Sequence, residues 1–402
     1  LEIQLAKNSH KHKISIAISN IKKSIMKSTK SILSLLLFVL FFTQCNQKQP
    51  AQDDTLNLKE LSEIPVLDVE FIPEKYVAYK MEKPINIDGE LTESEWGNIE
   101  WTAKFDDLEG DKKSKPLYDT KVKMAWDDNY FYFGAELIEP HIWATLKDHD
   151  DIVLYNNDFE LFIDPDGDTH HYCEIEMNVF TTVWDLILTK PYRDKGKVID
   201  SWHVYGLKKA VKVYGTINDP SDIDDRWTVE MAIPWKVMEE LASHGGAPND
   251  GEQWRVNFLR VNWQMDFENG SYKRKIDPET NKPFNCYNWI WTVSGNSGCH
   301  APELWSFVQF SDKQPGTDQF RDNPNDDVKW TLRQVYYRQR EFMKEHYEYA
   351  INSSQLKLED LTIDGLTFAP EISMMNGRWE AKQKAFNNKT AFIRWDGKVW
   401  IE

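Results

Sequence analysis

Alternating apolar and polar positions predict a chain built mostly from β-strands. In "DFELFID" at 158–164, Phe159, Leu161 and Ile163 fall on one face, and "CEIEMNV" at 173–179 repeats this period of two. Further segments with strand patterns lie at 121–126, 130–137, 226–235, 253–263 and 304–310. Because many short strands joined by polar turns are typical of two packed sheets, we expect residues 76–312 to form a β-sandwich in a mainly β chain.

The pattern changes after this region. Residues 313–327 are rich in Asp, Asn and Pro, which predicts a linker. From Val328 the apolar spacing is helical, and the residues expected on one face are Val328, Leu332, Val335, Phe342 and Tyr349. Asp326 or Asp327 is placed to cap the first turn. The end of the chain, 392–401, has the pattern of a hairpin. We therefore expect residues 328–402 to form a small α+β unit, whose role the pattern does not indicate.

The first 45 residues have the pattern of a targeting segment. Lys27 and Lys30 precede an apolar stretch of 11 residues, 32–42, which is too short to span a bilayer but suits a signal peptide. Cys45 follows, and this order resembles a bacterial lipoprotein signal, in which the chain is cleaved before the cysteine and lipid is attached to its thiol. Plain secretion is the alternative. We expect 1–45 to be upstream residues and signal, and 46–75 to be a polar tether from a bacterial cell envelope, in the periplasm or at the outer-membrane surface.

Charge and cysteine content narrow the classes of partner. The net charge is -17, and an acidic body repels phosphate backbones, so no nucleic-acid partner is expected. Cys286 and Cys299 could pair in an oxidising compartment, whereas Cys173 lies within a strand pattern and reads as a buried apolar residue. No Cys/His spacing indicates zinc or haem c.

Five segments, taken in order, resemble the family 9 carbohydrate-binding modules and their relatives on bacterial surface lipoproteins. They are "INIDGELTESEW" (85–96), "WDDNYFYFGAEL" (126–137), "NDFELFIDPDGD" (157–168), "YCEIEMN" (172–178) and "DRWTVEMAIPW" (225–235). The resemblance covers residues 79–310. It implies a jelly-roll-like β-sandwich of the carbohydrate-binding module type, which binds sugars and usually holds structural calcium.

The strand pattern also suggests where a sugar would bind. The face opposite Phe159 carries carboxylates on 158–164 and carboxylates and an amide on 173–179. Such groups bind sugar hydroxyls, and aromatic rings stack on the C–H faces of a sugar ring. The predicted contacts are Glu160, Glu176, Asn178, Trp184, Arg260 and Trp291. We expect Arg260 to hold Glu160 or Glu176 in place, although a structural ion pair is the alternative for Arg260, as a solvated sheet face is for the acids.

The resemblance is incomplete at this face. Glu160 matches the family pattern, but Tyr155 is the only aromatic residue where the family has a tryptophan before the acidic strand. A second family tryptophan, before the last strand, has no counterpart, and Glu176 stands where an arginine is expected. Sugar binding by other contacts, a different ligand and loss of binding all remain open.

The motif "DPDGD" places Asp164, Asp166 and Asp168 at alternate positions. Hard carboxylate oxygens at this spacing suit Ca²⁺, and these three residues are the predicted metal ligands. The loop lacks the glutamate that would complete an EF-hand, and a polar hairpin turn is the alternative.

The function that we predict is non-catalytic carbohydrate binding, which would support glycan capture and carbohydrate catabolism. The partners would be mono-, oligo- or polysaccharides, with the membrane reached only through the lipid anchor. One alternative is a hydrolase acting on O-glycosyl bonds, because Glu174 and Glu176 would lie about 6.5–7 Å apart along one strand. An open acidic face would not raise the pKa of its acid, so catalysis is the weaker expectation. A b-type haem module using Met177 or His203 is a second possibility, and a protein partner for residues 328–402 is a third.

Overall fold

The computed structural model describes residues 71–295 and 298–402. The predicted signal with Cys45, and the predicted tether up to residue 70, lie outside these ranges. No helix within the described ranges is both long enough and apolar enough to cross a membrane.

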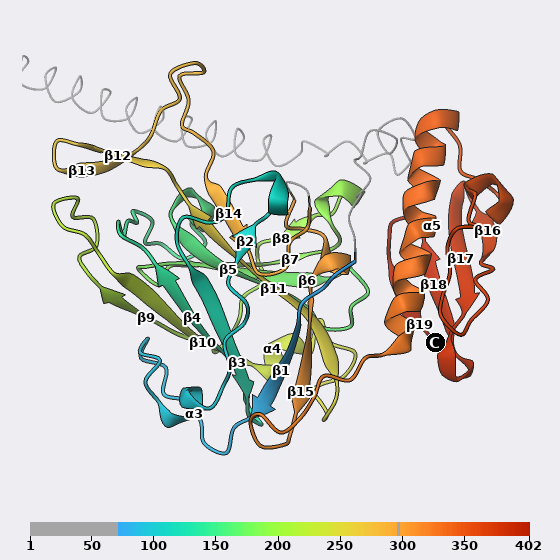
Figure 1. Ribbon diagram of the computed structural model, residues 1–402, viewed down its shortest axis with the longest axis horizontal. Helices are drawn as coiled ribbons and strands as arrows, with labels where there is room; N and C mark the ends of the chain where they lie inside the picture. The colour runs from blue at the N-terminus through green and yellow to red at the C-terminus, as the bar shows by residue number, and fades with distance from the viewer. Residues whose placement is uncertain (1–70, 296–297) are drawn as a thin grey trace, which may run out of the picture. The chain divides into compact units, whose positions relative to one another are not determined.

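The described chain is mainly β, as predicted (Figure 1). Its main sheet has 13 strands in the order β8-β7-β6-β5-β11-β15-β1-β3-β4-β10-β9, with β14 on β11 and β2 on β14. Strand β1 runs parallel to β15 and β3, and the other pairs are antiparallel. The bounds are β1 Lys75–Lys80, β2 Asp106–Asp107, β3 Thr120–Trp126, β4 Tyr130–Ile138, β5 Asp158–Asp164, β6 Tyr172–Asn178, β7 Val183–Leu188, β8 Val198–Ile199, β9 Lys208–Tyr214, β10 Arg226–Pro234, β11 Gln253–Asn262, β14 Tyr287–Ile290 and β15 Ser306–Ser311.

Shorter elements connect these strands. A separate hairpin is formed by β12 Met265–Glu268 and β13 Ser271–Arg274. The single-turn helices are α3 Ser94–Gly97 and α4 Trp235–Met238, and the 3-10 turns are η1 Gly110–Lys112, η2 Val153–Tyr155, η3 Tyr192–Asp194, η4 Pro302–Leu304, η5 Ser353–Leu356 and η6 Phe386–Asn388.

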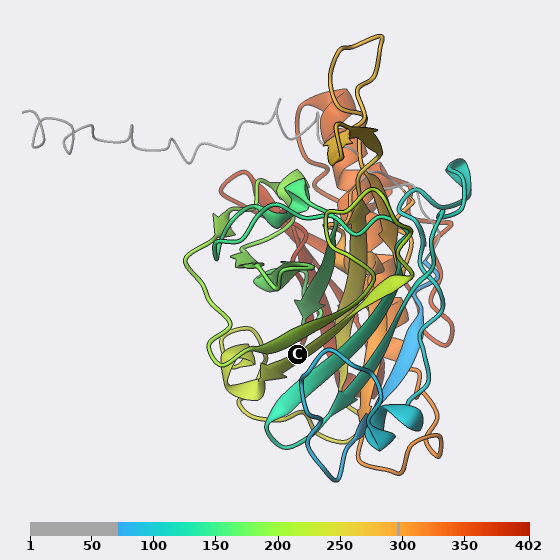
Figure 2. The same cartoon turned by 90° about the vertical axis from the view of Figure 1, so that its left-hand side faces the viewer.

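The main sheet curls so that its two halves pack face to face across one core (Figure 1, Figure 2). Phe133 of β4 and Phe258 of β11 are far apart in strand order, yet their ring centroids lie 5.9 Å apart. Phe159, Leu161 and Ile163 are fully buried in the same cluster, as their alternation predicts. The inward faces of the strands thus form the sandwich core, and their opposite faces carry the side chains that do not belong to this core.

The C-terminal unit consists of helix α5, Pro324–His346, and a four-stranded sheet. The strands are β16 Glu371–Met375, β17 Arg378–Lys384, β18 Thr390–Arg394 and β19 Val399–Ile401. The predicted helical face is confirmed at Val328, Leu332 and Val335, which are fully buried. Phe342 is half-buried, and Tyr349 lies beyond the end of the helix. The helix begins earlier than predicted, because Asn323 caps it by accepting from the Asn325 N–H and proline occupies the first turn.

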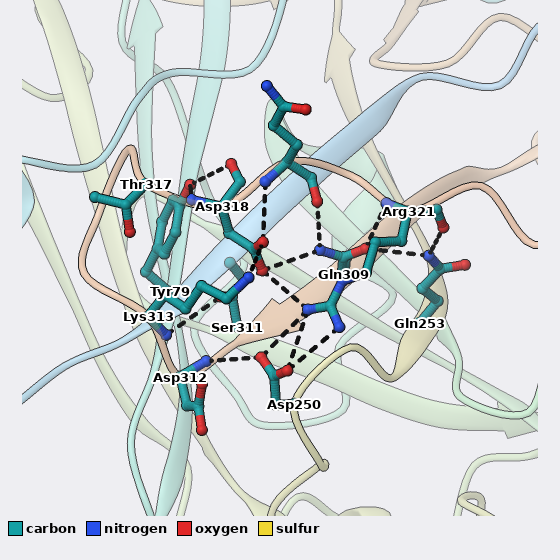
Figure 3. Close-up of polar contacts among 12 residues, drawn as sticks. Tyr79, Asp250, Gln253, Gln309, Ser311, Asp312, Lys313, Thr317, Asp318 and Arg321 are labelled. Atoms are coloured by element: carbon teal, nitrogen blue, oxygen red, sulfur yellow. Dashed lines mark hydrogen bonds and ion pairs between the residues drawn. The ribbon is translucent and has the colours of Figure 1, made fainter.

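The segment predicted as a linker is hydrogen-bonded to the sandwich (Figure 3). The Asp318 carboxylate accepts from Ser311 Oγ at 2.8 Å and from Arg321 Nη2 at 2.9 Å, and Lys313 Nζ lies 2.5 Å from it. Arg321 also pairs with Asp250, in the loop before β11. The contact with Lys313, together with the others, holds the pKa of Asp318 well below its usual range. The segment is therefore fixed to the edge of the sandwich rather than spanning freely between two units.

Buried charges join α5 to the sandwich. Arg340 Nη1 lies 2.9 Å from the Asp194 carboxylate in η3, and Tyr337 donates to Glu303 in η4 at 2.7 Å. Arg193 Nη2 lies 2.7 Å from the same oxygen, Glu303 Oε1, and 2.9 Å from Oε2. Burial alone would raise the pKa of Glu303, but its charged and hydrogen-bonding partners lower it to about 2. The face of α5 that does not cover its own sheet is thus occupied by the sandwich.

Candidate functional site

The pairing of β5 with β6 gathers carboxylates on the outer face of the sheet. In the register, Glu160 stands opposite Glu176, Phe162 opposite Glu174, and Asp158 opposite Asn178. One oxygen from each of Asp158, Glu160 and Glu176 lies within 4.8 Å of the other two. The sequence prediction that these two strands present acids on a shared face is correct.

The face is covered, which the sequence did not indicate. Glu160, Glu174 and Glu176 are 4%, 4% and 2% exposed. A second apolar cluster lies over them, and it is built from Leu108, Phe162, Tyr172, Leu186, Leu188, Leu259, Val261, Ile290 and Trp305. The segment that leads from β14 to β15 contributes Trp305 to this cluster, and Cys286, Val293 and Cys299 pack against it. Both thiols are free, so the suggested disulfide is not formed in the structure.

Burial sets the electrostatics of these acids. It raises the pKa of Glu160 to about 8, and burial together with neighbouring carboxylates raises the pKa of Asp158, Glu174 and Glu176 above the usual range. The expectation that this face could not raise the pKa of an acid is therefore wrong. A carboxylic acid that is protonated near neutral pH can both donate and accept a hydrogen bond.

Within the described residues, few hydrogen-bond donors or positive charges lie close enough to stabilise these carboxylates in their ionised form. The backbone N–H of Leu154 donates to Glu176 at 3.0 Å, and that of Val261 donates to Asp158 at 3.3 Å, but Asp158 Oδ2 is buried without a hydrogen-bond partner. The His300 ring lies 3.8 Å from Glu174, yet burial and the nearby Arg193 lower the pKa of His300 to about 3. The imidazole is thus neutral and does not offset the acids.

Aromatic side chains border the carboxylates. Trp184 on β7 is paired in register with Glu176 and is partly exposed. Trp263, just after β11, packs against the same cluster; its Nε1 donates to the Leu154 carbonyl at 2.9 Å, and the Arg274 guanidinium lies 3.9 Å from its ring. Sequence reasoning missed Trp263, although its parity with Val261 on one strand pattern placed it on this face. Nothing in the local sequence marked His300.

The structure does not bring Arg260 or Trp291 to this face. Arg260 is paired with Phe159, so the pleat directs it into the core, where its Nη2 lies 2.7 Å from Glu139 Oε2. Trp291 is 4% exposed and packs on Phe258 in the sandwich core. The expectation that Arg260 holds Glu160 or Glu176 is therefore wrong, and the alternative of a structural ion pair describes it.

Asn178 lies on the predicted face, but its side-chain amide is hydrogen-bonded to backbone groups of neighbouring loops. Its Nδ2 donates to the Leu146 carbonyl at 2.8 Å, and its Oδ1 accepts from the N–H groups of Phe180 and Thr182. It therefore fastens the loop before β5 to the turn after β6.

The "DPDGD" turn brings its three acids together. One oxygen from each of Asp164, Asp166 and Asp168 lies within 4.8 Å of the others. Among the described residues, Asp164 Oδ1 is buried without a hydrogen-bond partner. Burial and the neighbouring Asp168 raise the pKa of Asp166 to about 6. Both facts fit a group that would gain from a bound cation such as Ca²⁺. Lys398, whose Nζ lies 2.5 Å from Asp168, already offsets part of the charge.

The two residues suggested as haem ligands, Met177 and His203, lie in different environments. Met177 is fully buried among apolar side chains of the sandwich core. His203 lies instead beside Asp185 and His149. Because a haem pocket is mostly apolar on both sides of the ring, this arrangement does not favour an axial pair.

Comparisons with known proteins agree with the resemblance. Residues 87–253 match the family model described as carbohydrate family 9 binding domain-like. This match confirms the resemblance for the segment that holds Asp158, Glu160, Glu174 and Glu176. A family 9 carbohydrate-binding module from Caldicellulosiruptor kristjanssonii, in complex with cellotriose, is 15% identical with a TM-score of 0.37, covering 62% of this chain and 100% of that one. The module in complex with glucose is 15% identical with a TM-score of 0.38, covering 61% and 100%. No curated protein matches the chain.

Proposed function

We propose, from the premise that residues 87–253 form a carbohydrate family 9 binding domain-like segment, that this protein binds carbohydrate without cleaving it. The observation that carries the proposal is the group formed by Glu160, Glu174 and Glu176 beside Trp184 and Trp263. These acids are 2–4% exposed, so a sugar would reach them only if the apolar residues that cover them moved aside. The paired acids would then bind vicinal hydroxyls, and the partly exposed indole rings would cover the C–H face of the sugar. Glucose and short glucans, which the similar modules bind, are the first ligands to test.

Calorimetric titration tests this proposal. We expect one site for a mono- or oligosaccharide, and we expect Glu160→Ala to weaken binding about 10–100-fold, because a hydrogen bond to a charged or strongly polar partner contributes about 1.5–3 kcal/mol. Glu380→Ala, which removes an exposed carboxylate on β17, is the matched control and should bind like the unaltered protein.

Three further results of the titration are informative. Silence across the sugar panel from a folded protein would contradict the proposal. Release of reducing sugar would favour the hydrolase alternative that uses Glu174 and Glu176. A structural ion at the "DPDGD" turn would be supported if chelation of calcium weakens sugar binding by the unaltered protein but no longer changes sugar binding by Asp164→Asn. If chelation leaves binding by the unaltered protein unchanged, the result speaks against the ion.

The remaining part of the proposal concerns location. A lipid on Cys45 would hold the protein at the cell envelope of a bacterium, where it would supply captured glycan to carbohydrate catabolism. We expect the mature protein to incorporate a labelled fatty acid and to partition with membranes, and Cys45→Ser to lose both properties. Equal labelling of the two proteins would exclude this anchor.

A further inference from the structure

A second group of metal-ligating side chains lies away from the "DPDGD" turn. His149 and Asp150 come from the loop between β4 and β5, Asp185 from β7, and His203 from the segment between β8 and β9. One nitrogen or oxygen from each of the four lies within 4.8 Å of the other three. The fold thus brings together two imidazoles and two carboxylates from three separate segments.

The distances match those between the ligands of one tetrahedral ion. His149 Nε2 lies 3.2 Å from His203 Nδ1, 3.5 Å from Asp150 Oδ1 and 3.7 Å from Asp185 Oδ1. His203 Nδ1 lies 3.5 Å from Asp185 Oδ1. Ligands held at about 2.0–2.2 Å from a tetrahedral ion stand about 3.3–3.6 Å from one another. These four distances, from 3.2 to 3.7 Å, are therefore close to those that a small tetrahedral ion would impose.

Hydrogen bonding alone accounts poorly for this arrangement. His149 Nε2 can carry only one hydrogen, yet it has three polar neighbours at similar distances. Asp185 is already oriented, because its Oδ2 accepts from the Val204 N–H at 2.6 Å. This contact leaves Oδ1 directed at the two histidines, in the way that outer hydrogen bonds orient metal ligands.

The surroundings allow an ion to enter. The side chains of His149 and His203 are 52% and 31% exposed, while that of Asp185 is 3% exposed. The group borders a hollow of about 390 Å³ that Tyr205 and Lys209 also line. Lys209 lines the same hollow, and the two carboxylates outweigh its single positive charge.

We propose that His149, Asp150, Asp185 and His203 bind a divalent transition-metal ion, with Zn²⁺ preferred by the mixed nitrogen and oxygen ligands. The ion fastens the loop before β5 to β7. The same loop reaches the carboxylate face through the Leu154 N–H that donates to Glu176, so the metal stiffens one border of that face. The site does not depend on the proposed sugar binding.

Metal titration of the full chain tests this inference. The protein is freed of metal with a chelator and then titrated with Zn²⁺ in excess Ca²⁺, which fills sites made only of oxygen ligands. We expect one equivalent of Zn²⁺ to bind and to raise the melting temperature. With Co²⁺ as a probe, we expect the intense visible absorption of a tetrahedral ion.

Two single variants and a control place the site. We expect His149→Gln and His203→Gln each to weaken Zn²⁺ binding at least about tenfold and to remove the Co²⁺ signal. His346→Gln is the matched control, because its side chain is 50% exposed and lies on α5 outside the group. Far-ultraviolet circular dichroism of each metal-free variant checks that it has folded. Absence of Zn²⁺ binding by the unaltered protein, or equal binding by all the folded variants, overturns the proposal.

Discussion

Arg260→Met is expected to lower the free energy of unfolding by about 3–5 kcal/mol. Arg260 is fully buried, and its guanidinium lies 2.7 Å from Glu139, which is 3% exposed. Glu139 also accepts from the side-chain amides of Asn262 at 2.6 Å and Asn157 at 3.3 Å. Removal of the cation alone leaves a buried carboxylate that these amides cannot neutralise. Urea denaturation followed by tryptophan fluorescence measures the loss.

Two further variants separate the buried pair from a general effect of removing arginine. Glu139→Gln combined with Arg260→Met is expected to recover much of the loss, since the amide keeps hydrogen bonds without a charge. Arg338→Met removes a cation that lies 2.7 Å from the exposed carboxylate of Asp360 and should cost less than about 1 kcal/mol. If Arg260→Met costs no more than Arg338→Met, the pair does not hold the core as argued.

The sequence contained the signal that places Arg260, because strand parity is a local property. In "RVNFLRVNW" at 255–263, Arg260 shares its parity with Val256 and Phe258, which are core residues. The same rule assigns Trp263 to the carboxylate face. The strand pattern therefore sufficed for the fold and for the side of the sheet on which each acid lies.

The cover over the acids depends on contacts that the local sequence does not encode. The apolar cluster on the face of Glu160 includes Ile290 and Trp305, which are far along the chain, so only the tertiary fold decides whether that face is open. The His149 and His203 group has the same origin, since its ligands come from three loops and strands without a spacing motif. Parity and spacing rules therefore miss contacts between residues that are distant in the sequence and meet only in the fold.

Raising the pH from 6.5 to 8 is expected to destabilise the protein, by about 2 kcal/mol from Glu160 alone. The pKa of Glu160 is about 8 in the fold, against its ordinary value of 4.5. Between those values the folded protein holds a proton that the unfolded chain has released, so stability falls as the pH rises. The raised pKa of Asp158, Glu174 and Glu176 acts in the same direction.

The lower limit of this pH window leaves out most of one opposing effect, which comes from His300. His300 has its pKa lowered to about 3 from 6.5, so it adds stability as the pH rises, but only up to its unfolded pKa. Urea midpoints measured between pH 6.5 and 8, in the presence of a chelator, should therefore decline, and Glu160→Gln should make the decline shallower because the amide does not titrate. A flat or rising profile in the unaltered protein would mean that the acids are ionised in the fold. In that case a sugar would meet carboxylates that only accept hydrogen bonds.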